Sequence, residues 1–265
     1  MSWFLLLLPL ILIVSSILIY RFVGRGEVLH FDIVQFFYAF VFTPMAFVWM
    51  KVLLYLLLKN NFANGTSDLN YLMIDSVFSL IFLYIFGFEM LHGLTKTVSL
   101  NVSKDPLYDI FHYLEYFHLW MTHLVVFGGG ITTITILGLA NLFFPLDLTM
   151  TKLNFYLILL SGLVVGGLIF MGIWLSDPKQ EKGYHFMRIM KALIGILFLI
   201  HTIGYFLAQP KLTPDYLVYW WSAISFTIMV MAAFVSYKSN RARNWIERLS
   251  DKLKHPGFEF RLQIK

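Results

Sequence analysis

The sequence contains no cysteine and few charged residues, and each absence excludes classes of protein. Without cysteine there is no disulfide bond, no thiolate nucleophile and no cysteine-ligated zinc or iron–sulfur cluster. Only 13% of the 265 residues are charged and 59% are hydrophobic, so the chain cannot supply the charged surface that a soluble domain needs. The sequence also lacks a P-loop, a nucleophile elbow and a dinucleotide fingerprint. Any chemistry therefore belongs inside a helical bundle or to partner chains, and we assign no catalytic residue.

The chain instead has a succession of apolar runs of about 20 residues, each long enough to cross a hydrocarbon core of roughly 30 Å. These runs predict an all-α, polytopic integral membrane protein with seven transmembrane helices. Proline removes a backbone donor, so Pro44 predicts a kink in the second of them. The expected spans are Trp3–Tyr20, Ile33–Leu58, Tyr71–Val98, Pro106–Phe144, Leu153–Leu175, Phe186–Ala208 and Tyr216–Tyr237.

The fourth predicted span is unusually long. As one helix, Pro106–Phe144 would measure about 58 Å, which is too long for a single crossing. We therefore expect an interfacial first part, a tilt, or a break near the glycines Gly128–Gly130.

Lysine and arginine residues are distributed unevenly between the two ends of the predicted spans. This bias places the amino terminus outside and the carboxy terminus in the cytoplasm, of a plasma or inner membrane. We divide the chain into a transmembrane bundle (1–237) and a basic amphipathic tail (238–265). The pattern of the tail, with one apolar and one basic face, is open to three interpretations. The tail lies on an anionic membrane surface, it binds a soluble partner, or it is a solvated continuation of the last span. Because the basic residues lie beside membrane spans, we expect lipid and other protein subunits as partners, and no nucleic acid.

Ionisable side chains are costly inside a membrane, so they mark candidate sites. At about 100° per residue, four such residues of the third span share one face of a helix: Asp75, Glu89, His92 and Lys96. If the third and fourth spans form an antiparallel hairpin of assumed register, Glu89 lies level with His118 and His92 with Glu115. Both spans then present a Glu-x-x-His pair.

This pattern is open to two interpretations with a cofactor. The first is a dinuclear metal site with the ligands Glu89, His92, Glu115 and His118, which is half of the set used by di-iron and di-manganese bundles. The second is haem b with axial histidines. His112 and His123 are about 16 Å apart along one helix face. His201 is the expected partner of His123, at a similar depth, and His92 or His185 is the expected partner of His112.

Two further interpretations need no cofactor. In the first of them, a transporter or channel uses Glu89, His92 and Glu115 as a protonation switch. The glycines Gly128–Gly130 would then make the fourth span discontinuous. Alternatively, the Glu–His contacts only hold the hairpin together. We further expect Lys51 and Lys191 to extend toward the membrane ends, and Gly162-x-x-x-Gly166 to form a close helix-packing face.

These features lead to three functional hypotheses. The first is an integral membrane subunit of a larger, energy-transducing complex that transfers electrons or protons. The second is a proton-coupled transporter or ion channel. The third is a structural or assembly subunit without a cofactor.

Overall fold

A computed structural model describes residues 2–23, 27–28, 31–63, 68–101, 121–177, 186–238, 244–246 and 248–249. These residues are helical almost throughout, apart from an antiparallel pair of two-residue strands. The elements are α1 (Ser2–Phe22), β1 (Glu27–Val28), β2 (Phe31–Asp32), α2 (Ile33–Phe37), the π-helix η1 (Tyr38–Phe42), α3 (Thr43–Ala63), α4 (Asp68–Asn101), α6 (His123–Phe143), α7 (Lys152–Leu175), α8 (Phe186–Ala208), the 3-10 helix η4 (Pro214–Tyr216) and α9 (Leu217–Lys238).

Six helical segments of the described chain are long and apolar enough to cross a membrane, which confirms an all-α, polytopic membrane fold. The apolar part of α1, Leu8–Phe22, is shorter than any of these six segments. The six segments are Ile33–Leu58, Leu69–Thr95, His123–Phe143, Lys152–Leu175, Phe186–Ala208 and Pro214–Ser236.

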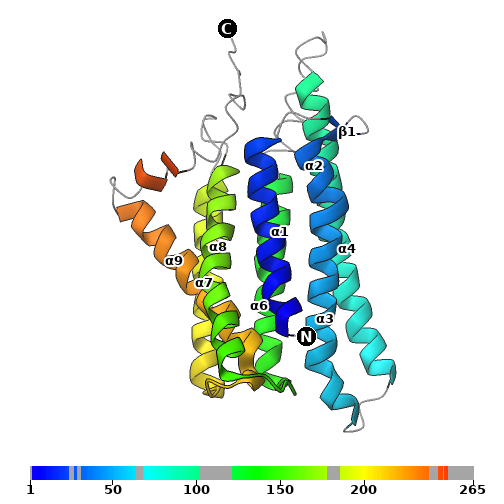
Figure 1. The fold of residues 1–265 in the computed structure, drawn as a ribbon, viewed down its shortest axis with the longest axis vertical. Helices are drawn as coiled ribbons and strands as arrows, with labels where there is room; N and C mark the ends of the chain where they lie inside the picture. Colours follow the sequence, from blue (N-terminus) through cyan, green and yellow to red (C-terminus); the bar gives the residue numbers. More distant parts are fainter. Residues whose placement is uncertain are drawn as a thin grey trace.

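The helices stand side by side in an elongated bundle (Figure 1). α3 and α4 form one flank, α1 and α6 lie in the middle, and α7, α8 and α9 form the other flank. α9 packs against α6, α7 and α8, whereas α1 bridges α3 and α7. We call the end of the bundle at which α9 reaches Lys238 the tail end.

The closest helix contact joins α7 to α9 and depends on two glycines. A Cβ at Gly162 would lie 2.9 Å from the carbonyl oxygen of Trp221, and one at Gly166 would lie 2.8 Å from the Cα of Ser225. The Ser225 hydroxyl is 3.0 Å from the Gly162 carbonyl oxygen and donates to it. The predicted packing face Gly162-x-x-x-Gly166 is therefore present, and α9 is the helix that it receives.

A buried asparagine joins the end of α6 to the start of α9. The Oδ1 of Asn141 accepts hydrogen bonds from the backbone N–H groups of Val218 (3.0 Å) and Tyr219 (3.1 Å). Its Nδ2 donates to the carbonyl oxygens of Phe144 (3.1 Å) and Asp215 (2.9 Å). The first N–H groups of a helix have no partner within that helix, so Asn141 caps α9 from a distant part of the chain.

The three glycines Gly128–Gly130 lie inside α6, which continues through them to Phe143. A break of the fourth span at these glycines was a wrong expectation. Close packing explains why a glycine stands at one of these positions. A Cβ at Gly129 would come within 2.8 Å of the Ile85 side chain on α4. α6 and α4 approach closely because this glycine has no side chain.

The second span contains the irregularity that Pro44 predicts, in the form of a π-helical turn, η1. The backbone N–H of Thr43 bonds to the carbonyl oxygen of Tyr38, and the Thr43 hydroxyl donates to the same oxygen at 2.8 Å. A proline ring clashes with the carbonyl group four residues before it, so a wider turn accommodates Pro44. π-Helical turns are frequent at functional sites, and this one helps to build the site described below.

Two neighbouring residues of the tail differ in their exposure: one is buried against the bundle and the other is exposed. Ile246 is only 7% exposed and belongs to a hydrophobic cluster with Phe170, Phe186 and Met229, whereas Trp245 is 63% exposed. The tail therefore packs against the bundle through Ile246.

Candidate functional site

The polar residues of α4 face the rest of the bundle at two levels. Asp75 contacts α3 near one end of the helix. Near the tail end, Glu89 is only 6% exposed and His92 contacts α6. The side chain of Lys96 lies outside the described residues. α4 thus presents two separate polar sites, which we take in turn.

The first site, the inner polar cluster, lies between α4, η1 and α6 near the tail end. His92 is its centre. The Nδ1 of His92 is 3.2 Å from the hydroxyl of Thr122, a residue with no exposed surface. The rings of His92 and His123 are in contact, with their centroids 4.7 Å apart and their planes at 43°. The other members are Gln35, Tyr38 and Glu89.

Glu89 lies three residues before His92, so the two side chains are neighbours on one face of α4. From η1, the Tyr38 side chain lies close to Ser16 of α1 and to Glu89. Gln35 is 2% exposed, and a Cβ added to the α4 glycine Gly93 would lie 3.7 Å from its Cβ. Side chains from several helices therefore surround a carboxyl group that has little contact with solvent.

The observed register of α4 against α6 differs from the predicted one. His92 lies against Thr122 and His123, about two helical turns later in the chain than Glu115, its expected partner. The packing of Ile85 against Gly129 agrees with the observed register. The predicted pairing of His92 with Glu115, and of Glu89 with His118, involves residues outside the described part of the chain and stays a prediction. His112, Glu115 and His118 themselves lie outside the described residues.

His201, the expected haem partner of His123, belongs to a different part of the bundle. The ring of His123 contacts Phe186 at the start of α8, with centroids 5.9 Å apart. His201 is fifteen residues further along α8, about 22 Å along the helix axis. The two histidines therefore do not share a depth. The reason is that His123 lies level with the start of α8, whereas a span counted from Pro106 had placed His123 near its middle.

The ring nitrogens of His201 both have partners. Its Nδ1 lies 2.8 Å from the carbonyl oxygen of Leu197, which can only accept, so Nδ1 holds a proton. Its Nε2 lies 3.0 Å from the hydroxyl of Ser222. His201 is 2% exposed, and the Tyr219 hydroxyl donates to its backbone carbonyl at 2.8 Å. These contacts describe a packed polar link between α8 and α9.

The structure does not bring the predicted axial pair of His123 and His201 together, and His112 and His185 lie outside the described residues. The Ser222 hydroxyl lies 3.0 Å from Nε2 of His201 and 2.9 Å from the Tyr219 carbonyl oxygen. For the dinuclear metal site, Glu89 and His92 are present on α4. Among the residues that the structure describes, no three histidine, aspartate or glutamate side chains converge on one point.

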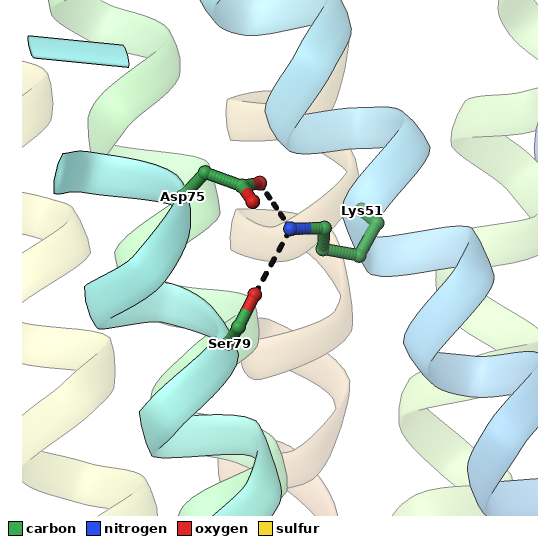
Figure 2. Close-up of polar contacts among 3 residues, drawn as sticks. All are labelled: Lys51, Asp75 and Ser79. Carbon is green, nitrogen blue, oxygen red and sulfur yellow. Dashed lines mark hydrogen bonds and ion pairs between the residues drawn. The ribbon is translucent and has the colours of Figure 1, made fainter. Parts of the chain in front are cut away.

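The second site is the ion pair of Lys51 on α3 with Asp75 on α4 (Figure 2). The Nζ of Lys51 also donates to the hydroxyl of Ser79 at 3.0 Å and lies 5.7 Å from the centre of the Phe47 ring. The Lys51 and Asp75 side chains are 26% and 25% exposed. Lys51 therefore points to a carboxylate on the neighbouring helix, and the expectation that it only extends toward a membrane end is wrong.

A sequence signal for this ion pair existed. Lys51 lies twelve residues before the end of α3 and Asp75 seven residues after the start of α4, so both stand about two to three helical turns from the loop that joins these helices. Two antiparallel helices joined by a short loop place such positions side by side.

Lys191 also has polar and aromatic partners inside the bundle. Its Nζ donates to the Ser236 hydroxyl at 3.0 Å and lies 5.4 Å from the Trp174 ring.

Comparisons with protein-family models, with curated protein sequences and with solved structures found no match to this chain. The chemistry of the two sites therefore rests on their own residues.

Proposed function

We propose that this chain is an integral membrane subunit that transfers protons, and that the inner polar cluster is its proton-binding site. The observation behind this proposal is the position of Glu89. It is a buried carboxyl group one helical turn from His92, whose ring contacts Thr122 and His123 on α6. Ionisable groups buried within membrane spans are typical of proton relays.

The residue types of the cluster suit protons better than electrons or metal ions. Imidazole gains and loses a proton between about pH 5 and 8, and burial brings carboxyl groups toward the same range. The Thr122 hydroxyl both donates and accepts, so it can pass a proton to or from His92. The described histidines contact aromatic rings, hydroxyl groups and a backbone carbonyl.

The setting of the cluster supports a role within a larger assembly. α4 is the least buried of the six apolar spans, and much of its surface is available to lipid or to further subunits. The proposal assigns the protein to a plasma or inner membrane that maintains a proton gradient. Other membrane or peripheral subunits are proposed partners.

Proton flux in liposomes tests the proposal. The full chain is reconstituted with a pH-sensitive dye inside, and a potassium diffusion potential drives proton entry at external pH values from about 5 to 8. We expect Glu89→Gln to lower the flux about tenfold or more, because a positioned proton acceptor is lost. His123→Phe keeps an aromatic ring beside His92 and is expected to lower the flux as well.

Asp147→Asn is the matched control. It makes the same change from carboxylate to amide at an exposed position outside the helices, and we expect wild-type flux. Equal flux in the wild type and in Glu89→Gln at every pH would overturn the proposal. A wild-type rate no higher than that of empty liposomes would favour a structural or assembly subunit instead.

Electron transfer is distinguished by an oxidised-minus-reduced visible spectrum of the purified protein. The contacts of His92, His123 and His201 predict a spectrum without haem bands. A Soret shift with an α-band, lost in both His123→Ala and His201→Ala, would replace proton transfer by electron transfer as the function of the cluster.

A further inference from the structure

The two polar sites of α4 lie at mirrored depths within the same membrane span. The apolar segment runs from Leu69 to Thr95. Asp75 is six residues inside its first end and Glu89 six residues inside its second end, about 9 Å in each case. The two carboxyl groups are about 21 Å apart along the helix. One site is thus near each end of the hydrocarbon layer.

An aromatic pair separates the two sites. Phe82 lies between Ser79 and Glu89 on the inward face of α4, at the three- and four-residue spacing that keeps side chains on one face, and is 8% exposed. Its ring contacts that of Phe47 on α3, with centroids 4.5 Å apart. From 80 to 88 the one residue with a polar side-chain atom is Tyr84, which is 60% exposed and therefore points away from this face.

Phe47 connects this barrier to the ion pair, because its ring also contacts the ammonium group of Lys51. The order along the α3–α4 contact is therefore Asp75 with Lys51 and Ser79, then the two phenylalanines, and then Glu89. Hydrophobic constrictions of this kind block protons and ions by excluding water.

We infer that the Lys51–Asp75–Ser79 site is a second proton-binding site, at the opposite side of a Phe47–Phe82 gate from Glu89. This inference rests on the proposed function of the inner polar cluster. Asp75 takes a proton from water at its end of the bundle. When the two rings separate, water enters between the sites and the proton passes along it to the Glu89 carboxylate. Only O–H bonds form and break, and the net change is one proton moved from Asp75 to Glu89.

A purely structural ion pair does not account for all of these observations. Such a pair would stabilise the α3–α4 hairpin wherever along the contact it lay. This pair is instead a quarter exposed, and it is aligned with Glu89 on one helix face. In this proposal water reaches Asp75 from the nearby end of the span, and the contact with Ser79 keeps Lys51 held while Asp75 is protonated.

The test uses the liposome assay with the double variant Lys51→Met/Asp75→Asn. Both charges are removed together, because a single unpaired charge in this position would be strongly destabilising. We expect the flux to fall about tenfold, as in Glu89→Gln. If the double variant keeps wild-type flux while Glu89→Gln loses it, the second site is wrong and the proposed function stands. If neither variant changes the flux, both are wrong.

The gate is tested by a gain of flux. Phe82→Ala widens the constriction, and we expect proton flux to rise about tenfold as water enters. Adding Glu89→Gln to this variant should abolish the gain, whereas a leak through a disordered protein would persist and would overturn the gate. Phe170→Ala is the matched control, since it removes a ring of the same size from the other hydrophobic cluster, where its exposure is 2%. We expect no gain of flux there.

Discussion

Replacing Asn141 with leucine is expected to lower the free energy of unfolding by about 3–5 kcal/mol. The side chain is completely buried and makes four hydrogen bonds that join α6, the loop before α9 and α9 itself. Leucine has a similar volume but leaves the N–H groups of Val218 and Tyr219 without this acceptor. Each buried unsatisfied group costs about 1–3 kcal/mol. Heating in detergent, followed by size-exclusion chromatography, should show a Tm roughly 10 °C below the wild type.

The matched control for this change is Asn154→Leu in the first turn of α7, at the same end of the bundle. The Asn154 side chain is only partly buried, and its backbone N–H is bonded to the Thr151 hydroxyl, which the substitution keeps. We expect the Tm to change by less than about 2 °C, as for most surface substitutions. Equal losses in the two variants would show that Asn141 is not a specific cap of α9.

The second large effect is expected at Gly166. Substitution with alanine places a methyl group against the backbone oxygen, Cα and carbonyl carbon of Ser225 on α9. Backbone atoms cannot turn aside as a flexible side chain can, so the two helices must separate. Overpacking of this kind costs about 1–3 kcal/mol, and we expect the upper part of this range together with a Tm lower by roughly 5–10 °C.

The neighbouring glycine provides the control, because Gly167→Ala makes the same chemical change one position along α7. Its Cβ would lie 3.8 Å from a methyl group of Ile228, which is an ordinary contact. Alanine is also the better helix former by about 1 kcal/mol, so Gly167→Ala should keep or raise the Tm. A similar Tm for the two alanine variants would mean that α7 and α9 are not in the close contact described.

The sequence predicted the membrane-spanning helices because a chain in lipid has few ways to pair the hydrogen-bonding N–H and C=O groups of its backbone. An apolar run of about 20 residues forms a helix, and its limits follow from where polar residues begin. The predicted spans Leu153–Leu175 and Phe186–Ala208 agree with α7 and α8 to within one residue. The packing role of Gly162 and Gly166 was also predictable, since small residues at a spacing of four leave a groove on one face of a helix.

The arrangement of the site was less predictable, because it depends on how far one helix is displaced along another. Composition identified Glu89, His92 and His123 as inward-facing groups, but hydropathy alone left the register of α4 against α6 open by two helical turns. Thr122 was therefore missed as the partner of His92. Lys51 was misjudged because its partner lies on another helix, and Asn141 because it caps a helix that begins 76 residues later.

The position of α1 has a consequence for how the protein is made. α1 packs against α7, which begins 130 residues after α1 ends. At a synthesis rate of about 5–20 residues per second, roughly 7–26 seconds separate the appearance of these two helices. During this interval α1 has α2 and α3 as packing partners, which are made earlier than α7, and the Ser16 hydroxyl is satisfied by the Leu12 carbonyl of its own helix. The contact of α1 with α7 thus forms only after α7 has been made, whereas its contact with α3 can form much earlier.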